Sequence, residues 1–340
     1  MNAERFATIT EQYPQLRIAV VGDFCLDRYL EIDPTKVETS IETGLPVHNV
    51  VRVRAQPGGA GTVLNNLVAL GVGQIFPVGF AGDDGEGYEL RRALAALPGV
   101  RLDYFLQTTA RRTFTYCKPL MVEANRPPRE LNRLDQKNWT PTPPEVVEQL
   151  CAHLIAAAEQ ADALVVLEQE DQQATGVLTP AVLAALGRVA QSRPQQLILA
   201  DSRRGLRDFP PAIFKMNATE LSALTGLAAT AELKDIAAAA VRLSRQNQRP
   251  VFVTLSERGI LGVTPDGRTE HLLALPLRGE IDIVGAGDAV SANLVVALQS
   301  GATIRDALAL ANAASSIVIH QLGTTGTASV AQLRPLVVTG

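Results

Sequence analysis

Short apolar runs of strand length alternate with longer alanine- and leucine-rich stretches along most of this chain. The alternation is typical of βαβ units built around a parallel sheet, so we predict an α/β fold. In such sheets ligands bind at the carboxyl ends of the strands, where the loops lie. The predicted strands are 18–21, 75–78, 163–167, 197–200 and 251–255, with a hairpin over 261–275, and the predicted helices are 63–70, 90–97, 182–190, 231–246, 289–299 and 304–320.

Two segments break this alternation, roughly 28–54 and 108–134, and both carry stretches of period two such as 112–117. Period two indicates strands, here without helices between them. They would form either an insertion of edge strands or a small lid that closes over a substrate and excludes water. We therefore predict one domain over 1–340 with these two segments set apart from its central sheet.

Composition excludes several classes of protein. The 340 residues are 46% hydrophobic and carry a formal net charge of −4 without a basic block, which argues against nucleic acid as a partner. Residues 1–16 lack a continuous apolar region, and no run elsewhere approaches the roughly 18 apolar residues of a membrane span. Three widely spaced cysteines form no metal pattern and are expected to be thiols. We expect a cytoplasmic protein.

The strongest candidate for chemistry is the segment 282–288, DIVGAGD, which precedes a predicted helix. The first turn of a helix has free N–H groups and partial positive charge, so it attracts phosphate. Gly285 and Gly287 let an anion approach the backbone, and Asp288 would supply a general base in the same small volume. The alternative is an ordinary tight turn in which Asp288 caps the helix.

A second glycine-rich segment, 57–62 (PGGAGT), opens another predicted helix. Gly58 and Gly59 would let a ligand lie against backbone amides, or they would serve only as a hinge. The segment does not complete a dinucleotide-binding fingerprint, because Leu64 stands where the third glycine should be.

Polar side chains also follow the predicted strands. Asp27 after the first strand would accept two sugar hydroxyls or pair with Arg28, whereas Asp23 is better explained as a turn cap. Asn217 and Glu220 have the spacing of a helix capping box. The turn 254–259 would follow a nucleotide's phosphate and ribose or be a polar turn with Gly259 at positive φ. Neither pattern by itself requires a ligand.

These segments together resemble the ribokinase-like (PfkB) carbohydrate kinase family. The resemblance covers nearly the whole chain and rests on two separate signatures, 57–62 and 282–292. Within the family, the segments 20–29, 132–135 and 253–259 are most similar to the sugar-kinase part of the bacterial enzymes of ADP-heptose biosynthesis, which are heptose 7-phosphate kinases.

The resemblance implies a three-layer sandwich with a mostly parallel central sheet and a small β lid, acting as an ATP-dependent sugar kinase. It implies Mg²⁺, leaves open a monovalent cation near Asp282, and allows a homodimer through the lid. It assigns catalysis to Asp288, Gly285, Ala286 and Gly287, substrate binding to Asp27, Gly58, Gly59, Thr62 and Glu168, nucleotide binding to Asn217, Thr254, Ser256, Gly259 and Asn312, and Mg²⁺ binding through water to Glu220.

The chain departs from the family's pattern at Thr62, where asparagine is usual, at Val284, where threonine is frequent, and at Arg203, where the heptose kinases carry lysine. These departures keep open a non-catalytic paralogue that binds sugar or nucleotide. Among enzymes, the alternative is a nucleoside or ketose kinase of the same family. Four cations of the lid-like segment would grip a phosphate already on the sugar, or form a solvated strand face. They are Arg111, Arg112, Lys118 and Arg133.

Overall fold

The computed structural model describes residues 1–124, 126–228 and 230–338. The helices are α1 (Ala3–Thr10), α2 (Ala60–Ala69), α3 (Gly85–Ala95), α4 (Pro144–Gln160), α5 (Pro180–Ser192), α6 (Ala218–Thr225), α7 (Leu233–Asn247), α8 (Ala286–Gln299), α9 (Ile304–Val318) and α10 (Val330–Val337). The strands are β1 (Arg17–Gly22), β2 (Phe24–Thr39), β3 (Pro46–Gly59), β4 (Gln74–Gly82), β5 (Phe105–Thr108), β6 (Phe114–Met121), β7 (Arg129–Glu130), β8 (Ala163–Glu168), β9 (Leu197–Ser202), β10 (Ile213–Asn217), β11 (Val251–Thr254), β12 (Ile260–Val263) and β13 (Thr269–Leu272).

The central sheet has nine strands in the order β13-β12-β11-β10-β9-β8-β1-β4-β5. All neighbours from β5 to β11 pair in parallel, and β12 and β13 add an antiparallel edge. In register, Ile18 of β1 lies between Ile75 of β4 and Ala163 of β8. The predicted mostly parallel sheet and the hairpin after residue 260 are confirmed.

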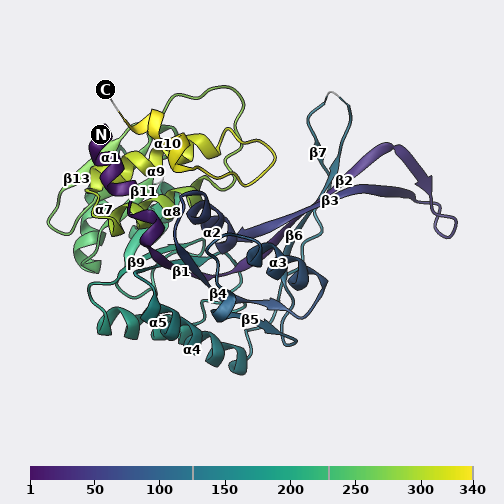
Figure 1. The fold of residues 1–340 in the computed structure, drawn as a ribbon, viewed down its shortest axis with the longest axis horizontal. Helices are drawn as coiled ribbons and strands as arrows, with labels where there is room; N and C mark the ends of the chain where they lie inside the picture. The colour runs from purple at the N-terminus through teal and green to yellow at the C-terminus, as the bar shows by residue number, and fades with distance from the viewer. Residues whose placement is uncertain (125, 229, 339–340) are drawn as a thin grey trace.

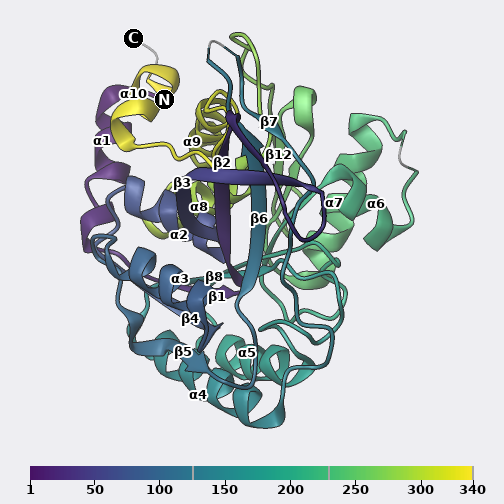
Figure 2. The ribbon, with the colours of Figure 1, turned by 90° about the vertical axis from the view of Figure 1, so that its right-hand side faces the viewer.

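Helices cover both faces of this sheet (Figure 2). Alternate residues of a strand point to opposite faces, and both faces of β1 are buried, which is why its apolar run is continuous. Ile18 and Val20 pack into one core with α2, α8 and α9, while Ala19 and Val21 pack into another with α4, α5 and α7. The three-layer sandwich is therefore present.

A second sheet, in the order β3-β2-β6-β7, projects away from this body (Figure 1). Its two long strands, β2 with 16 residues and β3 with 14, pair antiparallel, and β6 joins β2 in parallel. The strands expected over 28–54 and 108–134 are there, although β2 begins earlier, at Phe24. We call this second sheet the lid sheet after the predicted lid. Because β2 follows β1 directly and β3 leads into α2, its base lies at the carboxyl edge of the central sheet.

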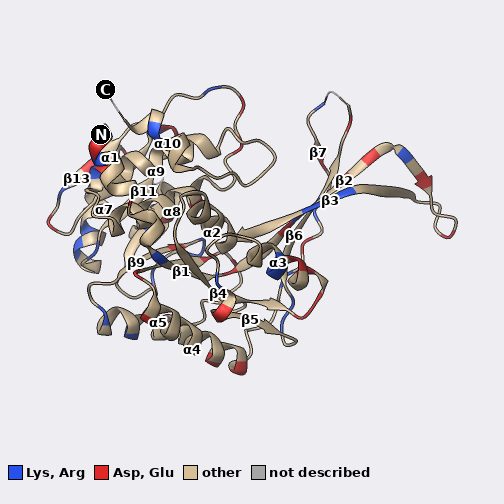
Figure 3. Ribbon diagram, in the orientation of Figure 1, with Lys and Arg blue, Asp and Glu red and all other residues tan. Residues whose placement is uncertain are grey.

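Charged residues of both signs are interspersed over the body and the lid sheet (Figure 3). Within the described ranges, no helix has both the length and the apolar character needed to cross a membrane. Cys25, Cys117 and Cys151 are free thiols, as expected from the sequence, and Cys25 and Cys117 are buried.

Candidate active site

A cavity of about 530 Å³ opens where the carboxyl ends of β1, β8, β9 and β10 meet the base of the lid sheet and the start of α8. This is the edge at which parallel sheets bind ligands. Of the predicted site residues, those that line the cavity are Asp27, Gly59, Thr62, Glu220, Gly285, Gly287 and Asp288. The other lining residues are Tyr116, Lys118, Arg133, Asp135, Lys137, Leu167, Gln169, Asp201, Arg203, Lys215, Ile283, Val284 and Thr325.

The start of α8 forms one wall of the cavity. Gly285 is its N-cap with φ 83°, a left-handed conformation that glycine adopts without strain. The amide of Ala286 donates to the carbonyl of Ile283, at 3.2 Å. Within the described chain, the amides of Gly287 and Asp288 have no backbone partner, so these two N–H groups and the helix dipole make a place for an anion.

Asp288, in the first turn of α8, lines the cavity beside these amides. The pKa of its carboxyl is raised to about 7: burial is the largest cause and the charges of Asp201 and Asp27 add to it, while Lys215 and Arg203 lower the pKa. A carboxylate with a pKa near neutrality accepts protons better than an ordinary aspartate while remaining substantially ionised at pH 7. Its position and pKa therefore suit a general base.

A buried ion pair lies beneath Asp288. Lys215 Nζ of β10 donates to Asp201 Oδ2 of β9 at 2.6 Å, and Ser291 Oγ of α8 donates to the same oxygen at 3.3 Å. Burial lowers the pKa of Lys215, but the charge and the hydrogen bond of Asp201 outweigh it, so the net shift is upward. Lys215 also interrupts the apolar run of β10, which is why the sequence did not predict that strand.

Asp27 of β2 also lines the cavity. The residue is only 5% exposed. Burial raises the pKa of its carboxyl, and the charges of Lys118 and Arg133 lower it to a smaller extent. Gly58 lies behind it: a Cβ there would stand 2.7 Å from the Asp27 carboxylate. The structure thus places Gly59 on the cavity and gives Gly58 the separate role of leaving room for Asp27.

Cations gather at the lid end of the cavity, around the ring of Tyr116. The Arg133 guanidinium lies 5.0 Å and the Lys137 ammonium 5.9 Å from the ring centroid, and Lys118 lines the same end. Arg111 is not among them, since it is buried and donates to the backbone of Thr140 and Thr175. Arg112 also lies outside the lining. The sequence pattern grouped four cations, of which the fold brings two to the cavity.

Asp23 holds the wall of the cavity in place. Its Oδ2 accepts from the amides of Gln169 and Glu170, and its Oδ1 accepts from that of Val177. The carboxylate is 1% exposed, and burial raises its pKa. It therefore ties the end of β1 to the loop between β8 and α5, which is a longer-range role than the predicted turn cap.

Replacing Asp23 with alanine is expected to destabilise the protein by about 2 to 4 kcal/mol, because three buried amides lose their acceptor. Urea unfolding would measure the loss, with Asp208→Ala, at an exposed position, as the control. A change below about 0.5 kcal/mol, which is usual for surface substitutions, would show that the loop does not depend on Asp23.

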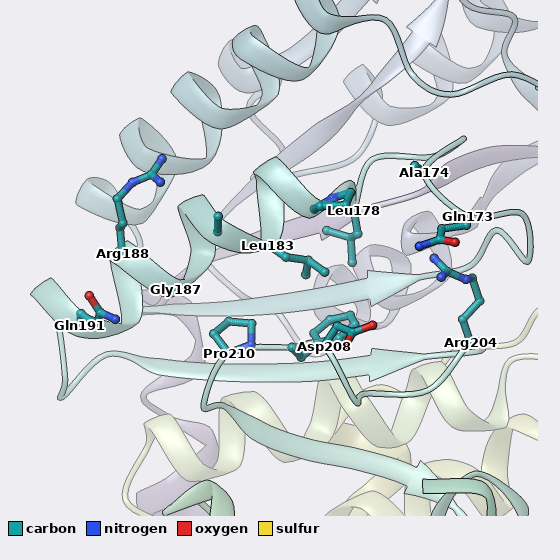
Figure 4. Close-up of a pocket in the computed structure, with 13 residues that line it drawn as sticks. Gln173, Ala174, Leu178, Leu183, Gly187, Arg188, Gln191, Arg204, Asp208 and Pro210 are labelled. Carbon is teal, nitrogen blue, oxygen red and sulfur yellow. The ribbon is translucent and has the colours of Figure 1, made fainter.

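Glu168, predicted to bind substrate, does not line the cavity. It ends β8 as a buried carboxylate that accepts from Ser202 Oγ and, at 2.7 Å, from Arg204 Nη1. Arg204 in turn lines a second cavity of about 500 Å³ between α5 and the loop after β9 (Figure 4). None of the predicted site residues lines this second cavity, so it is not the candidate site.

The capping box predicted at Asn217 and Glu220 is confirmed. Asn217 Oδ1 accepts from the Glu220 amide at 2.9 Å, and Glu220 Oε2 accepts from the Asn217 amide at 2.7 Å. Glu220 also lines the cavity. No group of three or more acidic, histidine or cysteine side chains in the described residues could hold an ion alone. A carboxylate beside a phosphate site fits Mg²⁺, which keeps much of its water and shares phosphate oxygens.

The residues predicted to bind nucleotide lie outside the cavity lining. Thr254 ends β11, and Ser256 and Gly259 flank the short turn that follows, with φ of 53° and 90°. Asn312 of α9 donates its side-chain amide to the carbonyl of Leu273, at 2.8 Å. Asn312 therefore attaches α9 to the segment after β13. The sequence did not predict this structural contact.

The fold and the cavity define an α/β protein of ribokinase-like architecture. Arabidopsis thaliana ribokinase complexed with ribose and ATP superposes on the chain with a TM-score of 0.70, at 19% identity, over 96% of this chain and 99% of that one. Phosphofructokinase-2 from Escherichia coli in complex with potassium gives a TM-score of 0.71, also at 19% identity, over 94% and 98%. At these identities the likeness establishes the fold.

The sequence comparison is more specific. Residues 15–331 match the model of the pfkB family of carbohydrate kinases, and the chain belongs to that family, whose members are phosphotransferases with an alcohol acceptor. The bifunctional protein HldE of Azorhizobium caulinodans is 33% identical over 90% of this chain and 61% of that protein. That of Gluconacetobacter diazotrophicus is 30% identical, over 94% and 63%. The chain thus spans less than two thirds of these relatives.

Proposed function

We propose that this chain transfers the γ-phosphate of ATP to a hydroxyl of a sugar that already carries a phosphate, with heptose 7-phosphate as the first acceptor to test. One observation carries the proposal: Asp288, the free amides of α8 and Asp27 face the same cavity. A base, an anion site and a hydroxyl-binding carboxylate are the components that phosphoryl transfer to a sugar requires.

In the proposed mechanism, Asp27 accepts hydrogen bonds from sugar hydroxyls and orients the acceptor. The acceptor oxygen attacks the γ-phosphorus as its proton passes to the Asp288 carboxylate, and the bond to the bridging oxygen breaks with its electron pair leaving on ADP. The amides of Gly287 and Asp288 donate to the oxygens on which negative charge accumulates. Thr62 and Gly59 complete the wall beside the acceptor.

Mg²⁺, when bound, would neutralise charge on the phosphates, with Glu220 holding it through water. Glu220 keeps an oxygen free for this, since only its Oε2 is used in the capping box. Burial raises the pKa of its carboxyl, and an adjacent cation would offset this rise.

We further propose a monovalent cation near Asp282, the site that the resemblance leaves open.

The lid end of the cavity supports an acceptor that already carries a phosphate. Lys118, Arg133 and Lys137 line the cavity there; Arg133 also pairs with Asp135, and Lys137 pairs with Glu170 and Asp171, whereas Lys118 makes no ion pair within the described residues. Such cations bind phosphate through charge-assisted hydrogen bonds, each worth about 1.5 to 3 kcal/mol. A sugar with a phosphate at one end would therefore present its other end to Asp288.

ADP release would be measured with Mg-ATP and a panel of heptose 7-phosphate, hexose phosphates, free hexoses, pentoses, ketoses and nucleosides. With the phosphorylated acceptor, Lys118→Met and Arg133→Met are each expected to raise KM about 10- to 100-fold with kcat within about threefold. Arg129→Met, an exposed cation of the same lid sheet, is the control. Selective turnover of phosphate-free acceptors, unaffected by the two variants, would instead identify a nucleoside or ketose kinase.

Silence across the panel with intact ATP binding would indicate the non-catalytic paralogue. The departure at Val284 does not favour that alternative, because Val284 serves the turn through its backbone: its amide donates to Asp282 Oδ1 at 3.0 Å.

We also propose that two copies associate through the lid sheet. Large apolar side chains are exposed along its outer part, among them Val37 at 64%, Ile41 at 98% and Leu45 at 64%. Association would cover this surface and the open edge of β3. Light scattering after gel filtration would give the mass in solution, and a monomer at micromolar concentration would contradict the proposal.

A further inference from the structure

Arg203 reaches the cavity from the end of β9, and the structure holds its guanidinium in place. Its backbone amide donates to the carbonyl of Glu168 at 3.1 Å, which fixes the start of the side chain. With the amide group of Gln169 oriented so that its oxygen faces Arg203, this oxygen lies 2.8, 3.0 and 3.2 Å from the three guanidinium nitrogens. Both side chains line the cavity.

The partner of Arg203 is neutral, and this distinguishes Arg203 from Arg133 and Lys215, two other cations that line the cavity. Arg133 pairs with Asp135 at 2.8 Å, and Lys215 pairs with Asp201 at 2.6 Å. Arg203 makes no ion pair with any residue of the described ranges. Gln169 therefore orients the guanidinium without neutralising its charge, and the charge is left for an anion in the cavity.

Arg203 lines the same cavity as Asp27, Asp288 and Glu220. Its charge lowers the pKa of Asp27 on the sugar side and that of Asp288 and Glu220 on the phosphate side. Lys215 acts on Asp288 and Glu220, and Lys118 acts on Asp27. In the proposed mechanism the sugar binds to Asp27 and the phosphates of ATP bind at the start of α8. The group that passes between these two sites is the γ-phosphoryl group.

We propose that Arg203 is a catalytic residue that contacts the transferred phosphoryl group, and that Gln169 is the positioning residue that orients it. The inference rests on the proposed kinase function. As the acceptor oxygen bonds to the γ-phosphorus and the bond to the bridging oxygen of ADP breaks, the guanidinium donates hydrogen bonds to the transferred group. The hydroxyl proton still goes to Asp288, so Arg203 only stabilises charge.

Arg203→Met is expected to lower kcat about 10²- to 10³-fold with KM for ATP within about threefold. Arg203→Lys should recover part of this, since it keeps the charge but loses the fork. Gln169→Leu and Gln169→Glu should each lower kcat about tenfold, the first by releasing the guanidinium and the second by neutralising it. Arg207→Met, at an exposed position of the same loop, is the control.

Two further measurements separate a catalytic from a structural role. The affinity for Mg-ADP with aluminium fluoride and acceptor, a mimic of the transferred group, should fall in Arg203→Met while that for Mg-ADP alone stays unchanged. The acid limb of the pH profile should also move to higher pH, because a cation near Asp288 is lost. Unchanged kcat, mimic affinity and acid limb in Arg203→Met would overturn the proposal. If the wild-type protein were inactive with every acceptor, the kinase function itself would be contradicted. Binding of the aluminium fluoride mimic tests the role of Arg203 separately, because it requires no turnover.

Discussion

Replacing Asp288 with asparagine is expected to lower kcat by about 10³- to 10⁴-fold while the protein stays folded. Asparagine has nearly the same shape but cannot accept the proton of the attacking hydroxyl. ADP release under saturating ATP and acceptor would measure the effect, with Asp208→Asn at an exposed position as the control. Retention of more than about a tenth of kcat in Asp288→Asn would place the base elsewhere.

The same residue sets the expected pH dependence. A general base acts when it is deprotonated, and the pKa of Asp288 is raised to about 7. For the wild-type protein, kcat/KM should therefore rise with pH through about 7 and level off above it. An acid limb near pH 4, typical of an exposed aspartate, would contradict the raised pKa of Asp288.

Asp288→Asn should also stabilise the protein above neutral pH. A carboxyl whose pKa is higher in the folded than in the unfolded state binds more protons when folded, so its contribution to stability falls as pH rises from about 4 to about 7. Asparagine removes that dependence, and we expect a gain of about 1 to 2 kcal/mol at pH 8 because the cavity is partly solvated. Urea unfolding should show a gain at pH 8 that is clearly larger than the gain at pH 5.

Lys215→Met alone is expected to cost about 3 to 5 kcal/mol of stability, because it leaves the Asp201 carboxylate buried without its cation. Lys215 and Asp201 are 6% and 7% exposed, and their 2.6 Å contact joins neighbouring strands. Urea unfolding of Lys215→Met, of Asp201→Asn and of the double variant would give the interaction free energy of the pair, apart from the effect of each single substitution.

The double variant should recover most of the lost stability, since no buried charge is then left unpaired. It should nevertheless lose activity, because Lys215 lowers the pKa of Asp288 and lies against the start of α8. A double variant as unstable as Lys215→Met would mean that packing, rather than charge, accounts for the loss. Lys234, which is exposed on α7, provides the control as Lys234→Met.

Much of the fold was predictable because its signals are local. The continuous apolar run of β1 and the capping box at Asn217 each lie within a few residues of sequence, and both are present. β10 was missed because Lys215 interrupts its apolar run, although the residue is buried against Asp201. The role of Asp23 was also misjudged, since the amides that it accepts from lie about 150 residues away.

Local sequence patterns were enough to predict the α/β class, the strands of the second sheet and the two glycine-rich segments that line the cavity. Which polar side chains meet depends on the tertiary structure: Lys215 lies against Asp201, Arg203 lies against Gln169, and Lys118 and Arg133, but not Arg111, line the cavity. The physical reason is that hydrophobic period and capping act over a few residues, whereas the neighbours of a strand end depend on the order β10-β9-β8-β1 in the sheet.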